Sequence, residues 1–352
     1  MSENLAAWFP VLRPHLSTDL VEDEAFHRLQ SLARNLPGDV MGVFEIRLAQ
    51  GRHPVDFSIR LQSPTQANTL AHRLPAPHLQ HLFETGWENL GFPEPVESLW
   101  LEFDDATIGA EFTGQNDGEP LPYPVVCARL KGKIEPEWLI SRLLPALHGL
   151  PLTEFQRESL RDCLANIPQG WHVLYAFSLR SRPHSQNAVR LELFGHDLES
   201  MHNYVHQLIS TDAANRLEEL SELYRGCDRY HLSFDISESE ISPRVGVEYA
   251  YARLPKDEPR WPELFDRLVE NGYCTEEKRA AVLKWPGYDT IWTSASRWPS
   301  GGRGYVVRGL SHLKVIVKGS EAIPNSKNYL IVEASRGSDR EAIQGRWNRE
   351  AI

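Results

Sequence analysis

Basic side chains that could bind an anion are spread over most of the chain, and each lies in or beside a segment where apolar and polar residues alternate. We assign these basic residues, together with one tyrosine, to the common polar face of the strand-like segments: Arg47, Arg60, Arg190, Arg244, Lys314, Lys318, Lys327 and Tyr329. A diphosphate group is bound wherever several such side chains converge, because charge-assisted hydrogen bonds need no linear motif. We therefore predict a diphosphate site built from several strands.

Aromatic and acidic residues on the same face could complete the chemistry of such a site. Tyr329 and Trp100 could shield a carbocation by cation–π contact and exclude the water that would quench it. We place His231 in the same acceptor pocket. The predicted general bases, which would take a proton from the acceptor, are Glu45, Glu102 and Glu248. For any one of these residues alone, the alternative is a charge balanced by its cross-strand neighbour.

Linear motifs for other chemistries are absent. The sequence has no G-x-x-x-x-G-K-[ST] phosphate loop, no G-x-S-x-G nucleophile elbow and no H-E-x-x-H pair. Asp104 and Asp105 are followed by Ala-Thr-Ile-Gly, so no D-D-x-x-D metal motif forms. Zinc-site spacing is also missing among the four cysteines, Cys127, Cys163, Cys227 and Cys274. We predict no metal ligands and four free thiols.

The composition is that of a globular protein with an acidic balance. Of 352 residues, 37 are Lys or Arg and 48 are Asp or Glu, which gives a formal charge of −11. Such a chain has no overall attraction to nucleic acid or to an anionic membrane, so a local basic cluster must draw in any anionic ligand. No apolar run is long enough to span a membrane, and the first residues do not form a secretory signal. We predict a cytoplasmic protein without nucleic-acid or membrane partners.

Strand-like runs, which must position these residues, come in pairs. Each run alternates apolar and polar residues, and the connections within a pair are short enough for antiparallel neighbours. The pairs are 43–48 with 55–62, 98–104 with 123–130, 171–179 with 188–194, 229–236 with 243–253, and 309–318 with 327–334. A regular βαβ chain would alternate single strands with helices, so Rossmann and TIM folds are disfavoured.

Helical periodicity separates the strand pairs. An opening helix over 5–36, broken at Pro10 and Pro14, precedes the first pair, and further helical stretches are predicted at 66–90, 135–167, 198–225 and 261–284. The order is therefore helices followed by two strands, five times. We predict a single α/β (α+β) domain over 1–352, with an N-terminal helical segment at 1–40, barrel repeats at 41–335 and a C-terminal tail at 336–352.

Closure of the sheet into a ten-stranded antiparallel barrel would remove both of its edges. The polar face would line a lumen too wide for side chains alone to fill, and the helices would lie outside. The alternation predicts a common cavity lined by Glu102, Arg190, His231 and Lys314. It predicts contacts with helices for Leu99, Leu191, Phe234 and Val315. The alternative is an open sheet with helices on one face and solvent on the other.

The five-fold repeat of helices and strand pairs resembles the αββα aromatic prenyltransferases, the PT-barrel family, over about residues 40–335. Strands of that family often carry a basic residue two positions before an aromatic one, and Lys327-Asn328-Tyr329 looks like such a step. Other strands depart from the pattern, because Ile316, Glu192 and Gly246 stand where a second basic or aromatic residue is expected. The resemblance implies a barrel ringed by helices, with Lys, Arg and Tyr of the lumen binding a prenyl diphosphate.

The activity that the resemblance implies is transfer of an allylic prenyl group from a diphosphate to an aromatic small molecule or peptide side chain, in natural-product biosynthesis. No cofactor would be required, although some family members use Mg²⁺. The acidic lumen residues and the missing tyrosines favour an alternative, a non-catalytic barrel or open sheet that binds a ligand as an accessory of a biosynthetic pathway. Convergence of the lumen cations would favour the enzyme, the relevant ones being Arg47, Arg60, Lys314 and Lys327.

Overall fold

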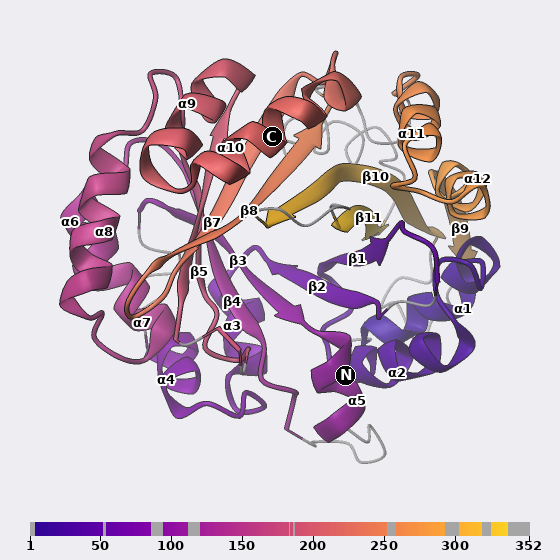
Figure 1. The fold of residues 1–352 in the computed structure, drawn as a ribbon. Coiled ribbons are helices and arrows are strands. Elements are labelled where there is room, and N and C mark those ends of the chain that lie inside the picture. Colours follow the sequence, from indigo (N-terminus) through magenta and orange to yellow (C-terminus); the bar gives the residue numbers. More distant parts are fainter. Residues whose placement is uncertain are drawn as a thin grey trace.

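A closed antiparallel barrel forms the centre of the molecule. The computed structural model describes residues 4–51, 54–85, 94–111, 120–182, 184–185, 187–251, 258–292, 303–318 and 325–336. In these residues the strands follow the order β11-β1-β2-β3-β4-β5-β6-β7-β8-β10, and β10 pairs again with β11. Ten strands therefore close into a ring, and helices surround it on the outside (Figure 1). The predicted barrel of helix–strand-pair repeats is confirmed, and the open-sheet alternative is wrong.

Each predicted strand-like run corresponds to one barrel strand. The bounds are β1 Met41–Arg47, β2 Asp56–Leu61, β3 Val96–Phe103, β4 Val125–Leu130, β5 His172–Ser178, β6 Val189–Gly195, β7 Arg229–Ile236, β8 Ile241–Ala250, β10 Arg303–Lys318 and β11 Asn325–Arg336. Strand β9 (Gly287–Trp292), which was not predicted, pairs with the first half of β10 beside the ring. This strand is short and begins with a glycine, so its alternation is too weak to indicate a strand.

The helices occupy the stretches where helical periodicity was predicted. Before the barrel come the 3₁₀ turns Leu5–Trp8 and Arg13–His15 with α1 (Phe9–Leu12) and α2 (Asp23–Ala33). Between and after the strand pairs come α3 Pro64–Ala71, α4 Pro77–Thr85, α6 Pro136–Trp138, a π-helical turn Leu139–Leu143, α7 Leu144–His148, α8 Glu154–Ala165, α9 Leu198–Leu208, α10 Thr211–Leu220, the 3₁₀ turn Ser221–Tyr224, α11 Trp261–Glu270 and α12 Glu276–Lys284. Helix α5 (Asp105–Glu111), which lies within the second strand pair, was not predicted.

Three further predictions concern the C-terminal tail, the cysteines and membrane-spanning segments. The tail predicted at 336–352 lies outside the described residues except for Arg336, the last residue of β11. The four cysteines are free, as predicted, and all four are buried. Among the described residues, no helix combines the length and the apolar character that crossing a membrane requires.

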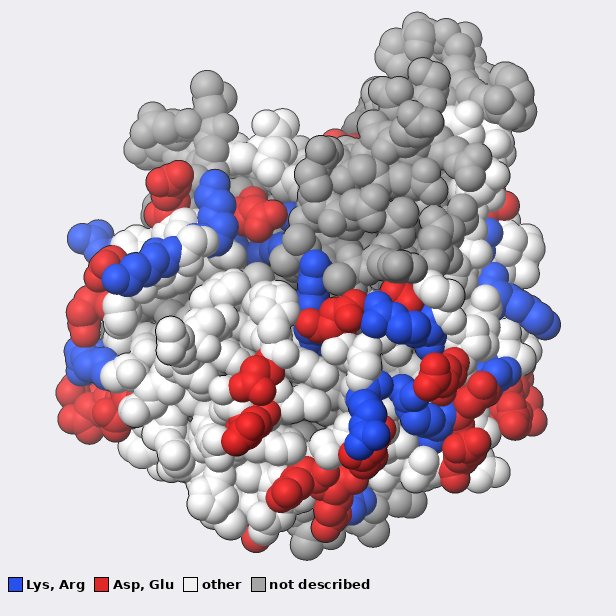
Figure 2. Space-filling view, turned by 90° about the horizontal axis from the view of Figure 1, so that it is seen from above, with Lys and Arg blue, Asp and Glu red and all other residues white. Residues whose placement is uncertain are grey.

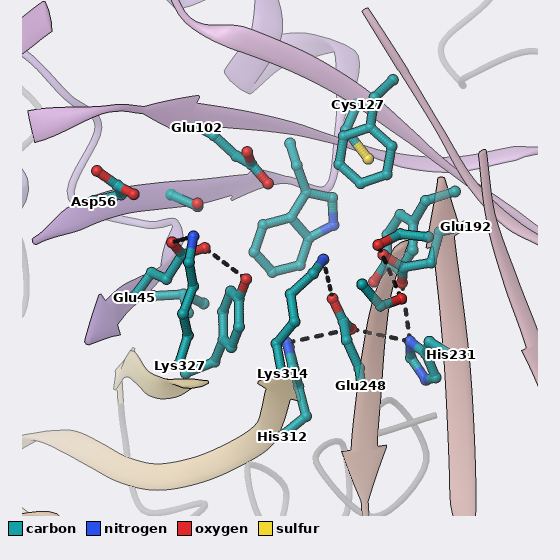
Figure 3. Close-up of a pocket in the computed structure, with 18 of the residues that line it drawn as sticks. Glu45, Asp56, Glu102, Cys127, Glu192, His231, Glu248, His312, Lys314 and Lys327 are labelled. Carbon is teal, nitrogen blue, oxygen red and sulfur yellow. Dashed lines mark hydrogen bonds and ion pairs between the residues drawn. The ribbon is translucent and has the colours of Figure 1, made fainter. Parts of the chain in front are cut away.

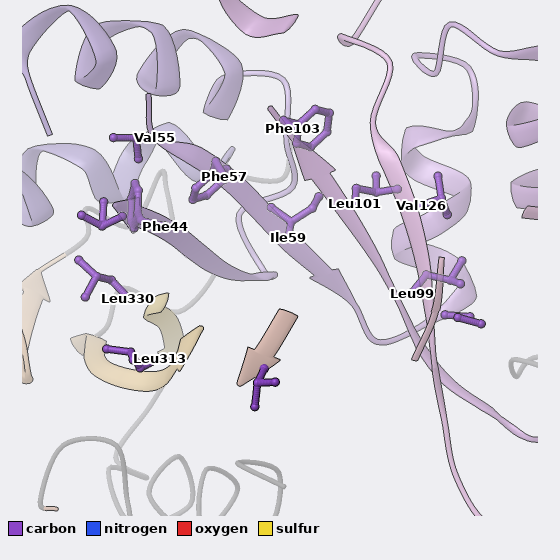
Figure 4. Packing of buried hydrophobic residues seen from close by; sticks show 14 of the residues in the cluster. Phe44, Val55, Phe57, Ile59, Leu99, Leu101, Phe103, Val126, Leu313 and Leu330 are labelled. Carbon is purple, nitrogen blue, oxygen red and sulfur yellow. The ribbon is translucent and has the colours of Figure 1, made fainter. Parts of the chain in front are cut away.

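The main hydrophobic core lies between the outward face of the strands and the helices. Leu99 and Leu191 are completely buried, and Phe234 and Val315 are each 1% exposed. Figure 4 shows a section of this layer, in which Phe44, Phe57 and Leu101 project from neighbouring strands on the same side of the sheet. The period-2 prediction for these outward positions is confirmed.

Charged residues on the outer surface are mixed in sign. On the face seen in Figure 2, Lys and Arg side chains lie beside Asp and Glu side chains over the described part of the surface. The described residues of this face therefore present no continuous basic area of the kind that nucleic acid requires.

Candidate active site

The inward face of the barrel encloses a cavity of about 330 Å³. Nearly all of the predicted site residues line it: Glu45, Arg47, Arg60, Trp100, Glu102, Arg190, His231, Arg244, Glu248, Lys314, Lys327 and Tyr329. Lys318 is the exception, because it is exposed at the end of β10 and does not line the cavity. The alternation put Lys318 on the correct face, but it could not show where the strand leaves the rim of the barrel.

One wall of the cavity carries a group that we call the Glu45 cluster, made of Glu45, Arg47, Asp56, Lys327 and Tyr329. Strand pairing brings them together, since Glu45 lies opposite Tyr329 on β11 and opposite Asp56 on β2. The ammonium of Lys327 donates to Glu45 Oε1, and the phenol of Tyr329 donates to Oε2 at 2.5 Å. Arg47 Nη2 lies 2.8 Å from Asp56 Oδ2. The cations of this wall are thus already bound to carboxylates.

The Glu45 cluster is buried, and its charges control one another. Burial opposes ionisation of Glu45, but the neighbouring Lys327 and Arg47 hold its pKa well below the usual range. Burial and the charge of Glu45 raise the pKa of Asp56 to about 7. Burial lowers the pKa of Lys327 despite the adjacent Glu45. Glu45 is therefore a weak base, and Asp56 is the carboxyl in this wall that can hold a proton near neutral pH.

The adjoining wall carries the His231 cluster, made of Glu192, His231, Glu248, His312 and Lys314 (Figure 3). His231 Nδ1 lies 2.9 Å from Glu192 Oε1 and 3.2 Å from Glu248 Oε2. Lys314 Nζ lies 2.7 Å from Glu248 Oε1, and His312 Nε2 lies 3.3 Å from Glu248 Oε2. Glu248 is therefore the centre of this network.

Charge pairing also sets the protonation of the His231 cluster. Burial opposes the charge on His231, but hydrogen bonds to Glu192 and Glu248 raise its pKa to about 9. Burial lowers the pKa of His312 to about 4. Burial likewise opposes the charge of Glu248, yet Lys314 and His312 hold its pKa well below the usual range. Glu248, like Glu45, is a weak base in this arrangement.

Two backbone features shape the His231 cluster. The register of β10 against β11 shifts between Leu310 and Leu313, so this bulge turns His312 into the cavity. On β8, a Cβ at Gly246 would lie 2.6 Å from Cε of Lys314. The missing side chain therefore leaves the space through which Lys314 reaches Glu248. This explains why Gly246 replaces the basic or aromatic residue expected on that strand.

Near one end of the barrel, arginines hold the remaining carboxylates. Arg182, in the connection after β5, lies 3.2 Å from Glu102 and 2.8 Å from Asp104. Arg190 lies 2.6 Å from Asp235. Burial raises the pKa of Glu102 in spite of Arg182. Of the three predicted general bases, Glu102 is thus the one with the raised proton affinity.

Elsewhere the lumen is apolar and aromatic. Trp100 packs against two buried apolar clusters, one containing Cys127 and Phe177 and the other containing Met41 and Val43. Arg60 is 3% exposed and binds Ser98 and Glu97 at 3.0 and 2.9 Å. The cavity therefore combines an aromatic surface with separate charged groups, as a site for an amphipathic ligand does.

Sequence reasoning missed several members of these clusters. The same alternation that found Arg60 could have found Asp56, which lies on the same face of β2. The sequence indicated that Glu192 is an acidic residue of the lumen, but it did not indicate that Glu192 pairs with His231. His312 lies in a bulge, and Arg182 lies in a connection, so no periodic signal marks either one.

The fold and the lumen together define an αββα barrel, the architecture predicted from the resemblance. Among solved structures, the chain is similar to 5-dimethylallyltryptophan synthase from Streptomyces coelicolor, with a TM-score of 0.53 and 11% identity over 94% of this chain and 98% of that one. It is also similar to AnaPT from Neosartorya fischeri, with a TM-score of 0.51 and 11% identity over 94% of each chain. No protein-family model and no curated protein matches the sequence. The likeness is thus one of fold.

Proposed function

We propose that the protein transfers an allylic prenyl group from a diphosphate donor to an aromatic acceptor, either a small molecule or a peptide side chain. The lumen carries this proposal, because cations from separate strands, among them Arg190, Lys314 and Lys327, line one cavity together with an aromatic wall. Its volume, about 330 Å³, falls in the range of small-molecule sites. The likeness in fold to a dimethylallyltryptophan synthase supports the same class of reaction.

In the proposed reaction, the lumen cations bind the diphosphate and stabilise it as it leaves. The anchors are Lys314, Lys327 and Tyr329, with Arg47, Arg60, Arg190 and Arg244 supplying further positive charge. The allylic C–O bond breaks, the aromatic ring attacks the allylic carbon, and the ring then loses a proton. Trp100 and Tyr329 shield the cation from water, and His231 borders the acceptor.

The acceptor proton goes to Glu102 in this proposal. Neighbouring cations hold the pKa of Glu45 and Glu248 low, whereas burial raises the pKa of Glu102. Since general-base catalysis contributes about 10²- to 10⁴-fold, Glu102→Gln should lower kcat by that factor and leave donor affinity unchanged. A loss of this size in Glu45→Gln or Glu248→Gln, with none in Glu102→Gln, would assign the role to another carboxylate.

Calorimetric titration with dimethylallyl, geranyl and farnesyl diphosphate, with and without Mg²⁺, tests donor binding. Removing one charge-assisted hydrogen bond costs about 1.5–3 kcal/mol, or roughly 10- to 150-fold in affinity. Lys327→Ala should show this loss while keeping a cooperative thermal transition. The matched control is Lys284→Ala, whose side chain is exposed on α12 and should not affect binding.

A specific observation favours the accessory-protein alternative. The lumen cations Lys314, Lys327 and Arg190 each lie at a carboxylate, so a diphosphate must compete with groups of the protein. In a barrel that only binds a neutral ligand, each of these cations would stay bound to its carboxylate. No heat from any of the three diphosphates with the wild-type protein, with or without Mg²⁺, would establish that alternative over the enzyme.

A further inference from the structure

Three potential metal ligands meet on three adjacent strands of the barrel. Glu192 on β6, His231 on β7 and Glu248 on β8 are 2%, 9% and 4% exposed. One ligand atom of each lies within 4.8 Å of the other two. His231 and Glu248 are direct cross-strand partners, so the barrel itself fixes their separation. No linear motif connects these residues, which is why the sequence predicted no metal ligands.

At Nδ1 of His231, two carboxylate acceptors face a single possible N–H donor. Its Nδ1 carries at most one hydrogen, yet it faces Glu192 at 2.9 Å and Glu248 at 3.2 Å. One N–H can point straight at only one of the two carboxylates. A divalent cation placed between the three groups would replace that hydrogen and contact both carboxylates and the ring nitrogen together.

A further histidine holds one of these three ligands from outside their group. His312 Nε2 lies 3.3 Å from Glu248 Oε2, the oxygen that also faces His231. Its other ring nitrogen, Nδ1, lies 3.0 Å from the hydroxyl of Ser311. Carboxylates that bind metals are usually held by outer partners of this kind. The bulge in β10 supplies both Ser311 and His312.

We propose that Glu192, His231 and Glu248 bind a divalent first-row transition-metal ion, with His312 as an outer partner that orients Glu248. Mixed imidazole and carboxylate donors suit Mn²⁺, Fe²⁺ or Zn²⁺ better than Ca²⁺ or Mg²⁺, which prefer oxygen. Glu248 can serve two partners, because Lys314 holds Oε1 and leaves Oε2 to the ion. Resting on the proposed function, the ion would add to the positive charge that the lumen lysines and arginines give a donor diphosphate.

Metal binding can be measured without any diphosphate. Chelator-treated protein is titrated separately with Mn²⁺ and Zn²⁺, and the bound metal is counted by elemental analysis; we expect one ion per chain. Glu192→Gln and His231→Gln remove direct ligands and should each weaken binding by more than 10-fold. Outer partners of metal ligands contribute about 10- to 100-fold, so His312→Gln should weaken binding by about 10-fold. The control is Asp104→Asn, a lumen acid paired with Arg182, which should bind like wild type.

Pulsed electron paramagnetic resonance of the Mn²⁺ protein adds a readout that is specific to the ligands. A nitrogen coupling should appear in the wild type and weaken or vanish in His231→Gln. The proposal fails if the wild type binds neither ion, or if Glu192→Gln and His231→Gln bind both ions as tightly as wild type.

The two proposals fail in different ways. If Mn²⁺ or Zn²⁺ binds at this cluster but no prenyl diphosphate binds to the loaded protein, the metal site stands and the proposed function falls. If a prenyl diphosphate binds to metal-free protein and neither ion binds, the proposed function stands and the metal site falls.

Discussion

The two faces of the barrel strands are built on opposite principles. Outward side chains such as Leu191 and Phe234 are apolar, buried and packed against helices. Inward side chains such as Glu248 and Lys314 are ionised and paired around an open volume. Burial of apolar area favours folding, whereas burial of paired charges returns little net stability. The comparison assigns stability to the outer face and ligand chemistry to the inner one.

The largest effect on stability is expected on the outer face. Leu191→Ala should lower the free energy of unfolding by about 3–5 kcal/mol, in the upper part of the range for such changes, because Leu191 is completely buried. Chemical denaturation followed by circular dichroism measures this loss. A loss below about 1 kcal/mol would break the comparison, since the outer face would then not carry the stability.

Opening an inner ion pair should cost somewhat less. Lys314→Met leaves Glu248 without its closest cation, and removal of one partner from a buried pair costs about 3 kcal/mol or more. His231 and His312 remain beside Glu248, so we expect the lower end of that range. The double variant Lys314→Met/Glu248→Gln should regain most of the loss. A double variant as unstable as the single one would show that the pair itself stabilises the fold.

A polar contact inside the outer layer gives a smaller, pH-dependent effect. His148 on α7 is 2% exposed and lies 3.1 Å from the hydroxyl of Ser178 on β5, and burial lowers its pKa to about 4. Below the unfolded pKa of about 6.5, the unfolded chain binds a proton that the folded chain does not, so stability falls as pH falls. Between pH 7 and 5.5 this group should remove about 1 kcal/mol. His148→Gln should lose correspondingly less stability over the same interval, and equal losses would contradict the assignment.

The smallest effect is expected at the outer surface of the helices. Glu219 on α10 forms a surface ion pair with Arg216, and the side chain of Glu219 is 61% exposed. Glu219→Ala should change the free energy of unfolding by no more than about 0.5 kcal/mol. If its unfolding midpoint fell as far as that of Leu191→Ala, burial would not be what separates the two faces.

The outer face could be predicted from the sequence better than the inner one, for a physical reason. Alternation of apolar and polar residues follows directly from the pleat, so the sequence alone was enough to place Leu99, Leu191 and Val315. Pairing between inward charges depends on the register of strands distant in the chain. Lys327 and Glu45, for example, are 282 residues apart in sequence but in contact in the lumen.

Irregular backbone accounts for most of the remaining differences. His312 lies in a bulge, Arg182 lies in a connection, and β9 pairs outside the ring, so periodicity locates none of them. For Lys318, periodicity predicted the correct face of the strand, but this face extends beyond the cavity, so Lys318 does not line it. The fold could thus be predicted almost completely, whereas the ion-pair networks of the lumen could not.

A crystal structure with a non-hydrolysable thiolo analogue of dimethylallyl diphosphate tests the central claim most directly. We expect the diphosphate inside the barrel, with oxygens about 2.7–2.9 Å from the ammonium groups of Lys314 and Lys327, the separation of charge-assisted hydrogen bonds. The prenyl chain should lie against Trp100. An analogue bound outside the barrel, or a lumen that keeps Lys327 on Glu45 and Lys314 on Glu248 and stays free of the analogue at saturating concentration, would contradict this claim.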